Sequence, residues 1–132
     1  MGAWGAGPFE NDDAVDWVWE LEDDTDGALL IAAFDAVVQL PSGEQPEAPE
    51  SSNALAAAEV VASARGHRSG ELPTEAEEWI GRHAEDVDDD LVALASAAVD
   101  RVLSDSELAD LWDDAGDPEW RVVTNALRSR LS

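Results

Sequence analysis

The sequence predicts an all-α fold: a compact single-domain bundle of six to seven short helices. Apolar residues recur three and four positions apart along most of the chain, which places them on one face of a helix. Residues that favour helix starts precede these runs, and glycine or proline follows them. The alternating pattern of a β-strand hardly occurs. A chain of 132 residues is long enough for one domain, residues 1–132, with its own core.

The first ten residues are rich in glycine and aromatic side chains, and we expect them to form an ordered Gly/Trp-rich loop. In this loop Trp4 and Phe9 would pack into the core. Asn11 is a predicted N-cap, because its side chain can accept a hydrogen bond from a free backbone N–H at the start of a helix. Asp12 and Asp13 then fall in the first turn, where carboxylates interact favourably with the helix dipole.

Two helices are predicted in the next part of the chain. The first helix ends before Asp26-Gly27, and residues 28–40 form a nearly continuous apolar segment that ends at Pro41. We expect this segment to be the central, most buried helix. Residues 41–52 are rich in proline and glutamate and predict a surface loop. Residues 54–65 predict the next helix.

Four further helices complete the predicted bundle. Residues 74–77 and 104–107 both match the capping-box pattern, in which a serine or threonine is followed three positions later by a glutamate. They would open two helices, one running to about residue 83 and one ending at Gly116, with an apolar helix over 91–103 between them. Asp117-Pro118-Glu119 combines an N-cap, a proline at the first helical position and an acid in the first turn, and opens the last helix.

The charge of the chain is extreme. Thirty-one acidic residues face seven arginines and no lysine, so the formal net charge is −24. Affinity for nucleic acid comes mainly from cationic side chains that displace counterions, so this composition argues against binding to nucleic acid or to an anionic membrane surface. Three explanations of the acidity stay open: a host cytoplasm of high salt, solubility of an Ala-rich helical domain, or a surface that receives a basic partner.

Several site classes lack their residues. There is no cysteine, which excludes disulfides, thiolate metal sites and thiol nucleophiles. Neither histidine belongs to a zinc or di-iron motif, and no serine lies in a nucleophile elbow, so we expect no catalytic residue, no metal and no cofactor. No apolar run reaches 18 residues and no basic-then-apolar leader opens the chain, so we expect a cytoplasmic protein without a membrane span.

Two acidic features need an explanation. Glu59 interrupts the apolar run of the helix predicted over 54–65, and if buried it requires a hydrogen-bonding or cationic partner. Asp12, Asp16, Glu20 and Asp24 are spaced by four and therefore lie along one helix face, where like charges repel one another. A hydrated cation layer, a neighbouring arginine or a basic partner could offset this repulsion.

A family resemblance covers essentially the whole chain. The first part of the chain carries a motif made of Gly2-Ala3-Trp4-Gly5, Gly7-Pro8-Phe9, Asn11-Asp12-Asp13-Ala14 and Trp17. This motif resembles the N-terminal motif of small bacterial proteins of the domain-of-unknown-function family 4259. Further similar stretches lie at 57–62, 100–103, 106–112 and 119–120. The resemblance implies a compact helical fold and a stand-alone protein, and it brings no established activity, cofactor or catalytic residue. Carried over residue by residue, the motif singles out as candidate functional or structural residues Trp4, Asn11, Asp12, Asp13 and Glu59.

The sequence leads to one functional hypothesis and two alternatives. The leading hypothesis is a non-enzymatic protein-interaction module that binds a basic partner protein. One alternative is a carboxylate-based or metal-dependent enzyme in which Asp12, Asp13 and Glu59 meet near the N-terminal motif. The other is that the acidity is only a halophilic or solubility adaptation of a domain with another role.

Overall fold

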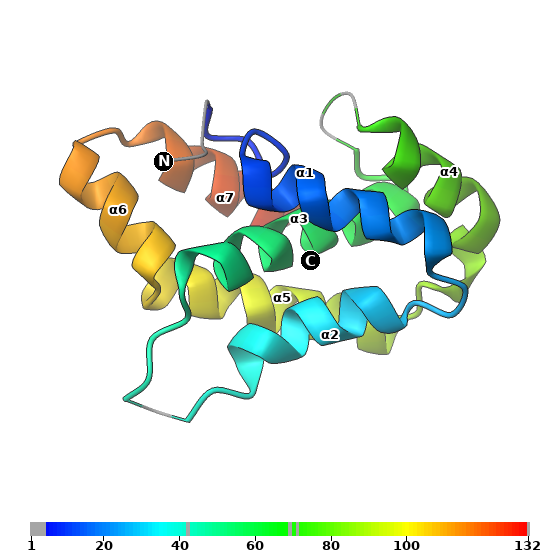
Figure 1. The fold of residues 1–132 in the computed structure, drawn as a ribbon, viewed down its shortest axis with the longest axis horizontal. Helices are drawn as coiled ribbons and strands as arrows, with labels where there is room; N and C mark the ends of the chain where they lie inside the picture. Colours follow the sequence, from blue (N-terminus) through cyan, green and yellow to red (C-terminus); the bar gives the residue numbers. More distant parts are fainter. Residues whose placement is uncertain (1–4, 42, 69, 71, 132) are drawn as a thin grey trace.

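The all-α prediction is confirmed. The computed structural model describes residues 5–41, 43–68, 70 and 72–131, and within them the chain forms seven α-helices, two 3-10 turns and no strand (Figure 1). The helices are α1 (Asp12–Trp19), α2 (Ala28–Val38), α3 (Ala48–Ala64), α4 (Thr74–His83), α5 (Asp89–Ser104), α6 (Glu107–Ala115) and α7 (Glu119–Arg130), and the 3-10 turns are η1 (Glu20–Asp23) and η2 (Ala84–Asp86). None of these helices combines the length and the hydropathy needed to cross a bilayer.

Helix α3 is the centre of the bundle. It contacts all six other α-helices, and 12 of its 17 residues are buried. Figure 1 shows it between α1 on one side and α2 and α5 on the other. Alanine, serine and valine make up most of α3, and their small side chains let neighbouring helices approach closely on every side. A helix surrounded in this way needs no single apolar face.

The prediction that residues 28–40 form the most buried helix is therefore wrong. Helix α2 packs on α3 and α5 through one face, which carries Leu30, Ala33, Phe34 and Val37, whereas Ile31 on another face is 43% exposed. The hydropathy of a segment depends only on its own residues. The number of helices that pack around the segment depends on the rest of the fold, so hydropathy alone did not identify the central helix.

The predicted surface loop over 41–52 also ends earlier than expected, because α3 begins at Ala48. Pro49 lies in the first turn, where a proline costs no helical hydrogen bond. Glu107 holds this helix start in place: its Oε1 accepts from the Ala48 N–H at 2.9 Å, and its own N–H donates to the Pro46 carbonyl at 2.9 Å. The partner that stabilises the start of α3 is thus distant in sequence.

The predicted helix caps agree with the structure only in part. Asn11 caps α1 as predicted, and its Oδ1 accepts from the Ala14 N–H at 2.8 Å. The two capping boxes are not formed. Thr74 is already the first residue of α4, and Ser106, in place of Ser104, caps α6. The buried Ser106 hydroxyl accepts from the backbone N–H of Ala109 at 3.0 Å and donates to a carbonyl of α5 at 2.7 Å.

The described part of the N-terminal segment packs on the bundle. Ala6 is buried, and Phe9, which was expected to pack into the core, is partly buried against it. A local turn orders this part, since the Glu10 N–H donates to the Gly7 carbonyl at 3.1 Å and the Glu10 carboxylate accepts from the Gly7 N–H at 2.9 Å. Trp4, the other expected core residue of this loop, lies outside the described residues.

Replacement of Ser106 by alanine is expected to lower the free energy of unfolding by about 1–2 kcal/mol, because the cap of α6 and a buried bond to α5 are lost together. Urea denaturation followed by circular dichroism measures this loss. Ser104→Ala is the control: this serine is exposed and bonds only a carbonyl of its own helix turn, so the change should stay within about 0.5 kcal/mol. Equal losses in both variants would contradict the assignment of the cap.

Candidate functional site

Four of the five residues singled out from the sequence are described by the structure, and they serve different purposes. Asn11 caps α1, and Asp12 and Asp13 are exposed in its first turn. Glu59 lies on α3 with only 3% of its surface exposed. The fifth residue, Trp4, falls outside the described part of the chain.

Glu59 is matched by an arginine from the other end of the domain. The guanidinium of Arg130 donates to both carboxylate oxygens, with Nη1–Oε2 and Nη2–Oε1 distances of 2.7 Å each. The Ser63 hydroxyl, one turn along α3, donates to Oε2 at 3.0 Å. Arg130 also donates to the His67 carbonyl at 2.8 Å, just beyond the end of α3. The expected ion-pairing partner of a buried Glu59 is therefore present.

The acidic residues of the N-terminal motif do not form a metal site with Glu59. Asp13 and Asn11 line one pocket, whereas Glu59 lines another with Pro8 and Phe9. Within the described residues no three histidine, aspartate or glutamate side chains come together in a way that could hold a metal ion. The enzyme alternative required Asp12, Asp13 and Glu59 to converge, and this arrangement does not provide that convergence.

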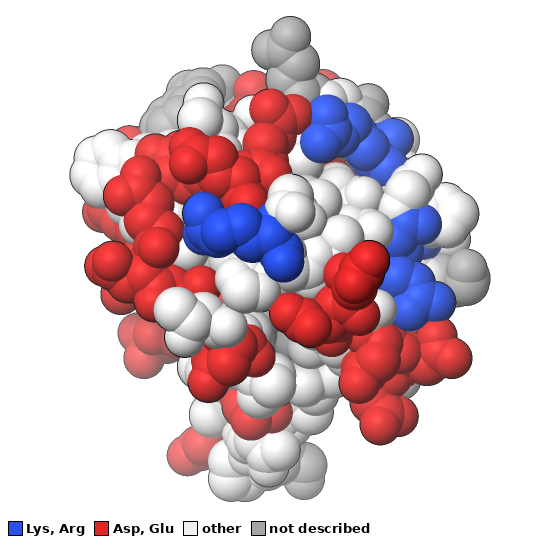
Figure 2. All heavy atoms as spheres, turned by 90° about the vertical axis from the view of Figure 1, so that its right-hand side faces the viewer, with Lys and Arg blue, Asp and Glu red and all other residues white. Residues whose placement is uncertain are grey.

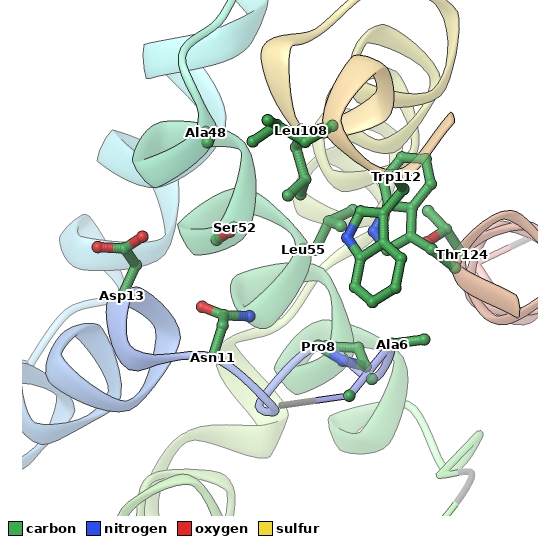
Figure 3. Close-up of a pocket in the computed structure, with 14 residues that line it drawn as sticks. Ala6, Pro8, Asn11, Asp13, Ala48, Ser52, Leu55, Leu108, Trp112 and Thr124 are labelled. Atoms are coloured by element: carbon green, nitrogen blue, oxygen red, sulfur yellow. The ribbon is translucent and has the colours of Figure 1, made fainter. Parts of the chain in front are cut away.

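The pocket at the N-terminal motif is narrow and mainly apolar (Figure 3). It has a volume of about 60 Å³ and lies where residues 5–13 meet α3, α6 and α7. Figure 3 shows Leu55, Leu108 and Trp112 around it. Two hydroxyls also line it, those of Ser52 and Thr124, which are 3% and 2% exposed, and neither has a hydrogen-bond partner among the described residues.

Among the described residues, no base lies beside the hydroxyls of this pocket. A serine or threonine hydroxyl becomes a nucleophile when a base accepts its proton at hydrogen-bond distance. Asp13 is the one ionisable side chain among the described lining residues, and it accepts no hydrogen bond from Ser52 or Thr124. The free space suits ordered water, which satisfies buried polar groups of this kind.

The arginines are largely used within the fold. Five of the seven form ion pairs with acidic side chains at 2.7–2.8 Å: Arg65–Asp89, Arg68–Glu77, Arg121–Asp113, Arg128–Asp100 and Arg130–Glu59. The two hydrogen bonds from Arg121 hold the pKa of the Asp113 carboxyl below its ordinary value. Arg101 donates to the Glu44 carbonyl. Arg82 forms no ion pair with a described residue.

The surface is consequently anionic. Figure 2 looks onto the end of the molecule where α4 lies and where α1 is joined to α2, and acidic side chains cover much of this face, with a few arginines among them. Because 31 acids share seven arginines, most carboxylates have no cationic partner within the chain.

Sequence reasoning missed Arg130 as the partner of Glu59 and the two pocket hydroxyls. A signal for the ion pair was available: a carboxylate within an apolar helix requires a cation, and only seven arginines could supply it. Nothing in the local pattern distinguished Arg130 from Arg128 in the same helix turn. The hydroxyls of Ser52 and Thr124 gave no signal, because both residue types occur at many surface positions.

Arg130→Ala is expected to reduce the free energy of unfolding by about 3 kcal/mol or more, because it leaves the buried Glu59 carboxylate without its guanidinium. Arg128→Ala is a matched control in the same helix turn. Its partner Asp100 is 56% exposed, so its loss should be about 0–1 kcal/mol. The double variant Glu59→Met/Arg130→Met should regain part of the stability, and chemical denaturation of all three variants tests this order.

Mutual repulsion of the unpaired carboxylates should also make the stability salt-dependent. Added NaCl shortens the Debye length from about 10 Å at 0.1 M to about 3 Å at 1 M, so we expect the Tm to rise by several degrees over this range. A variant with three exposed acids of α1 and η1 neutralised, Asp12→Asn/Asp16→Asn/Glu20→Gln, should show a smaller rise. A Tm that stays constant in both proteins would show that repulsion does not limit stability.

Comparison with known proteins connects this architecture to one family. No curated protein and no solved structure matches the chain. A family model described as domain of unknown function (DUF4259) matches residues 2–122, a region that includes the N-terminal motif, the central helix with Glu59 and the pocket residues Ser52 and Trp112. The chain belongs to this family of domains of unknown function.

Proposed function

We propose that this chain is a non-enzymatic protein-interaction module that binds a basic partner protein through its anionic surface. The observation that supports the proposal most directly is the distribution of the arginines. Since most of them are engaged by acids or carbonyls of the chain itself, the charge presented to other molecules is overwhelmingly negative. Such a surface attracts basic proteins over long range and repels phosphate backbones.

The acidic residues spaced by four along α1 and η1, which are Asp12, Asp16, Glu20 and Asp24, illustrate this charge distribution. Of these four residues, Asp24 has a structural role: its carboxylate accepts from the Gly27 and Leu29 N–H groups and from the indole N–H of Trp79. The other three, Asp12, Asp16 and Glu20, are exposed and form no ion pair with a described residue. Their repulsion is not offset by an arginine of the fold, which leaves it to solvent cations or to a partner.

An enzymatic role has less support in the geometry. The buried carboxylate of Glu59 is engaged by Arg130 and Ser63, and the pocket hydroxyls have no base within hydrogen-bond distance among the described residues. Buried carboxylates in ion pairs of this type commonly serve the structure.

Affinity purification from the source cells, with the chain as bait, tests the proposal. We expect a basic protein to be retained in near-stoichiometric amount at about 0.1 M NaCl and to be largely released at about 0.5 M, because salt screens the attraction. The control bait is an unrelated acidic protein of similar net charge, which separates specific binding from simple ion exchange. Retention of no protein beyond the control bait at either salt concentration would overturn the proposal.

A further inference from the structure

A groove at one end of the bundle combines apolar walls with carboxylates, and we propose that it is the docking site for a cationic segment of the basic partner. The groove has a volume of about 330 Å³ and lies between the start of α2, η2 and the first turns of α5. This inference rests on the proposed function and specifies where the partner binds and with which side chains. The end of the bundle that holds these elements faces the viewer in Figure 2, where carboxylates border uncoloured surface.

The apolar part of the groove comes from two helices. Ile31 of α2 lines it and is 43% exposed, which makes it one of the few large apolar residues that the fold leaves in contact with water. Leu91 and Leu94 of α5 are half-buried and lie three residues apart, so they share a helix face. Contact with methylene groups of a ligand would remove this apolar surface from water.

The walls are held by buried contacts. Trp79 borders the groove with only 1% of its surface exposed, and its indole N–H donates to Asp24 Oδ2 at 2.8 Å. Asp24 in turn accepts from the N–H groups at the start of α2. The two helices that supply the apolar residues also pack directly on each other. A groove of this kind exists before a ligand arrives, which reduces the entropic cost of binding.

Four exposed carboxylates line the same groove, and none of them forms an ion pair with an arginine. Asp26 and Asp88 accept backbone N–H groups at helix starts, Asp86 lies 3.1 Å from His83 Nδ1, and Asp90 has no partner among the described residues. The four lining carboxylates are Asp26, Asp86, Asp88 and Asp90.

This combination selects the chemistry of the occupant. Lysine and arginine side chains carry a methylene stem that packs on apolar surface and a charged head that remains at a polar edge. An arginine head can also donate two parallel hydrogen bonds to one carboxylate. An anionic segment would be repelled, and a purely apolar one would desolvate the carboxylates without pairing them. The groove therefore fits a segment in which arginine or lysine lies next to a leucine-sized residue.

The test uses the full chain and a defined probe, an acetylated peptide of alternating arginine and leucine. Titration followed by ¹H–¹⁵N NMR is expected to shift the backbone signals of Gly27, Ile31, Leu91 and Leu94 in a saturable manner, with smaller changes along α1. A peptide in which glutamate replaces arginine is the control, and it should produce no saturable shift.

Two variants of equal charge separate the groove from the general anionic field. The groove variant is Asp26→Asn/Asp86→Asn/Asp90→Asn, and it removes three of the groove's charges. The asparagine side chains keep an oxygen that can accept the local hydrogen bonds. Asp88, which caps α5, is left unchanged. We expect the groove variant to weaken peptide binding about tenfold or more in calorimetry. The control variant, Asp12→Asn/Asp16→Asn/Glu20→Gln, removes three charges from α1 and η1. It should weaken binding by less than about threefold.

A second pair of variants tests the apolar contact without changing the charge. Ile31→Ser should weaken peptide binding several-fold, whereas Val122→Ser, at a 66% exposed position of α7 outside the groove, should have no effect. Both positions are exposed, and circular dichroism and the Tm establish that each variant is folded.

The outcomes are distinguishable. Selective loss in the groove variants together with localised shifts supports the inference. Equal weakening by the two triple variants, with shifts spread over the surface, overturns the docking site and leaves the proposed function standing as binding by the general anionic field. Absence of saturable peptide binding also overturns the docking site. The proposed function is tested separately, by recovery of a basic partner in the affinity purification.

Discussion

The structure depends on the burial of one helix on every side. Helix α3 can contact all six other α-helices because its residues are mostly small, and a charge buried at such a position is costly unless it is paired. Glu59 lies within this helix, so its charge must be compensated inside the domain. Arg130 provides the compensation and at the same time bonds the His67 carbonyl beyond the end of α3. The ion pair between Arg130 and Glu59 therefore connects α7, the last helix, to α3, the central helix.

The same scarcity of cations shapes the surface. The protein has 31 acids and seven arginines, and five of these arginines form ion pairs with acids of the chain itself. Arg130 is used in the core, and four other arginines join neighbouring elements through exposed ion pairs. The rest of the surface is rich in carboxylates. In the groove lined by Ile31 and Leu94, carboxylates lie next to exposed apolar surface. The proposed binding function uses both the charge and the apolar contact, whereas charge alone would give only non-specific attraction.

Prediction from sequence succeeded where the cause is local. The N-cap Asn11, the acids that follow it and the helical spacing of apolar residues act over three or four positions, and the structure contains the corresponding helices and this cap. It failed where the cause is distant. The early start of α3 at Ala48 depends on Glu107, which is 59 positions away. The cap of α6 at Ser106 is a local feature that the capping-box pattern misplaced, since its hydroxyl bonds the Val102 carbonyl four positions earlier. For the candidate site, the requirement that a buried Glu59 find a partner was predictable, whereas the identity of the partner was not.

The amino-acid sequence by itself determined the helical class, the N-cap of the first helix and the negative net charge, because these follow from residue spacing and composition. Only the tertiary structure decided that α3 and not α2 is central, that Glu59 meets Arg130 across 71 positions of the chain, and that carboxylates from the turn before α2, from η2 and from the start of α5 border one apolar groove. The physical reason is that spacing along a helix defines which side chains share a face, while the partner of that face is selected by packing among segments far apart in the chain.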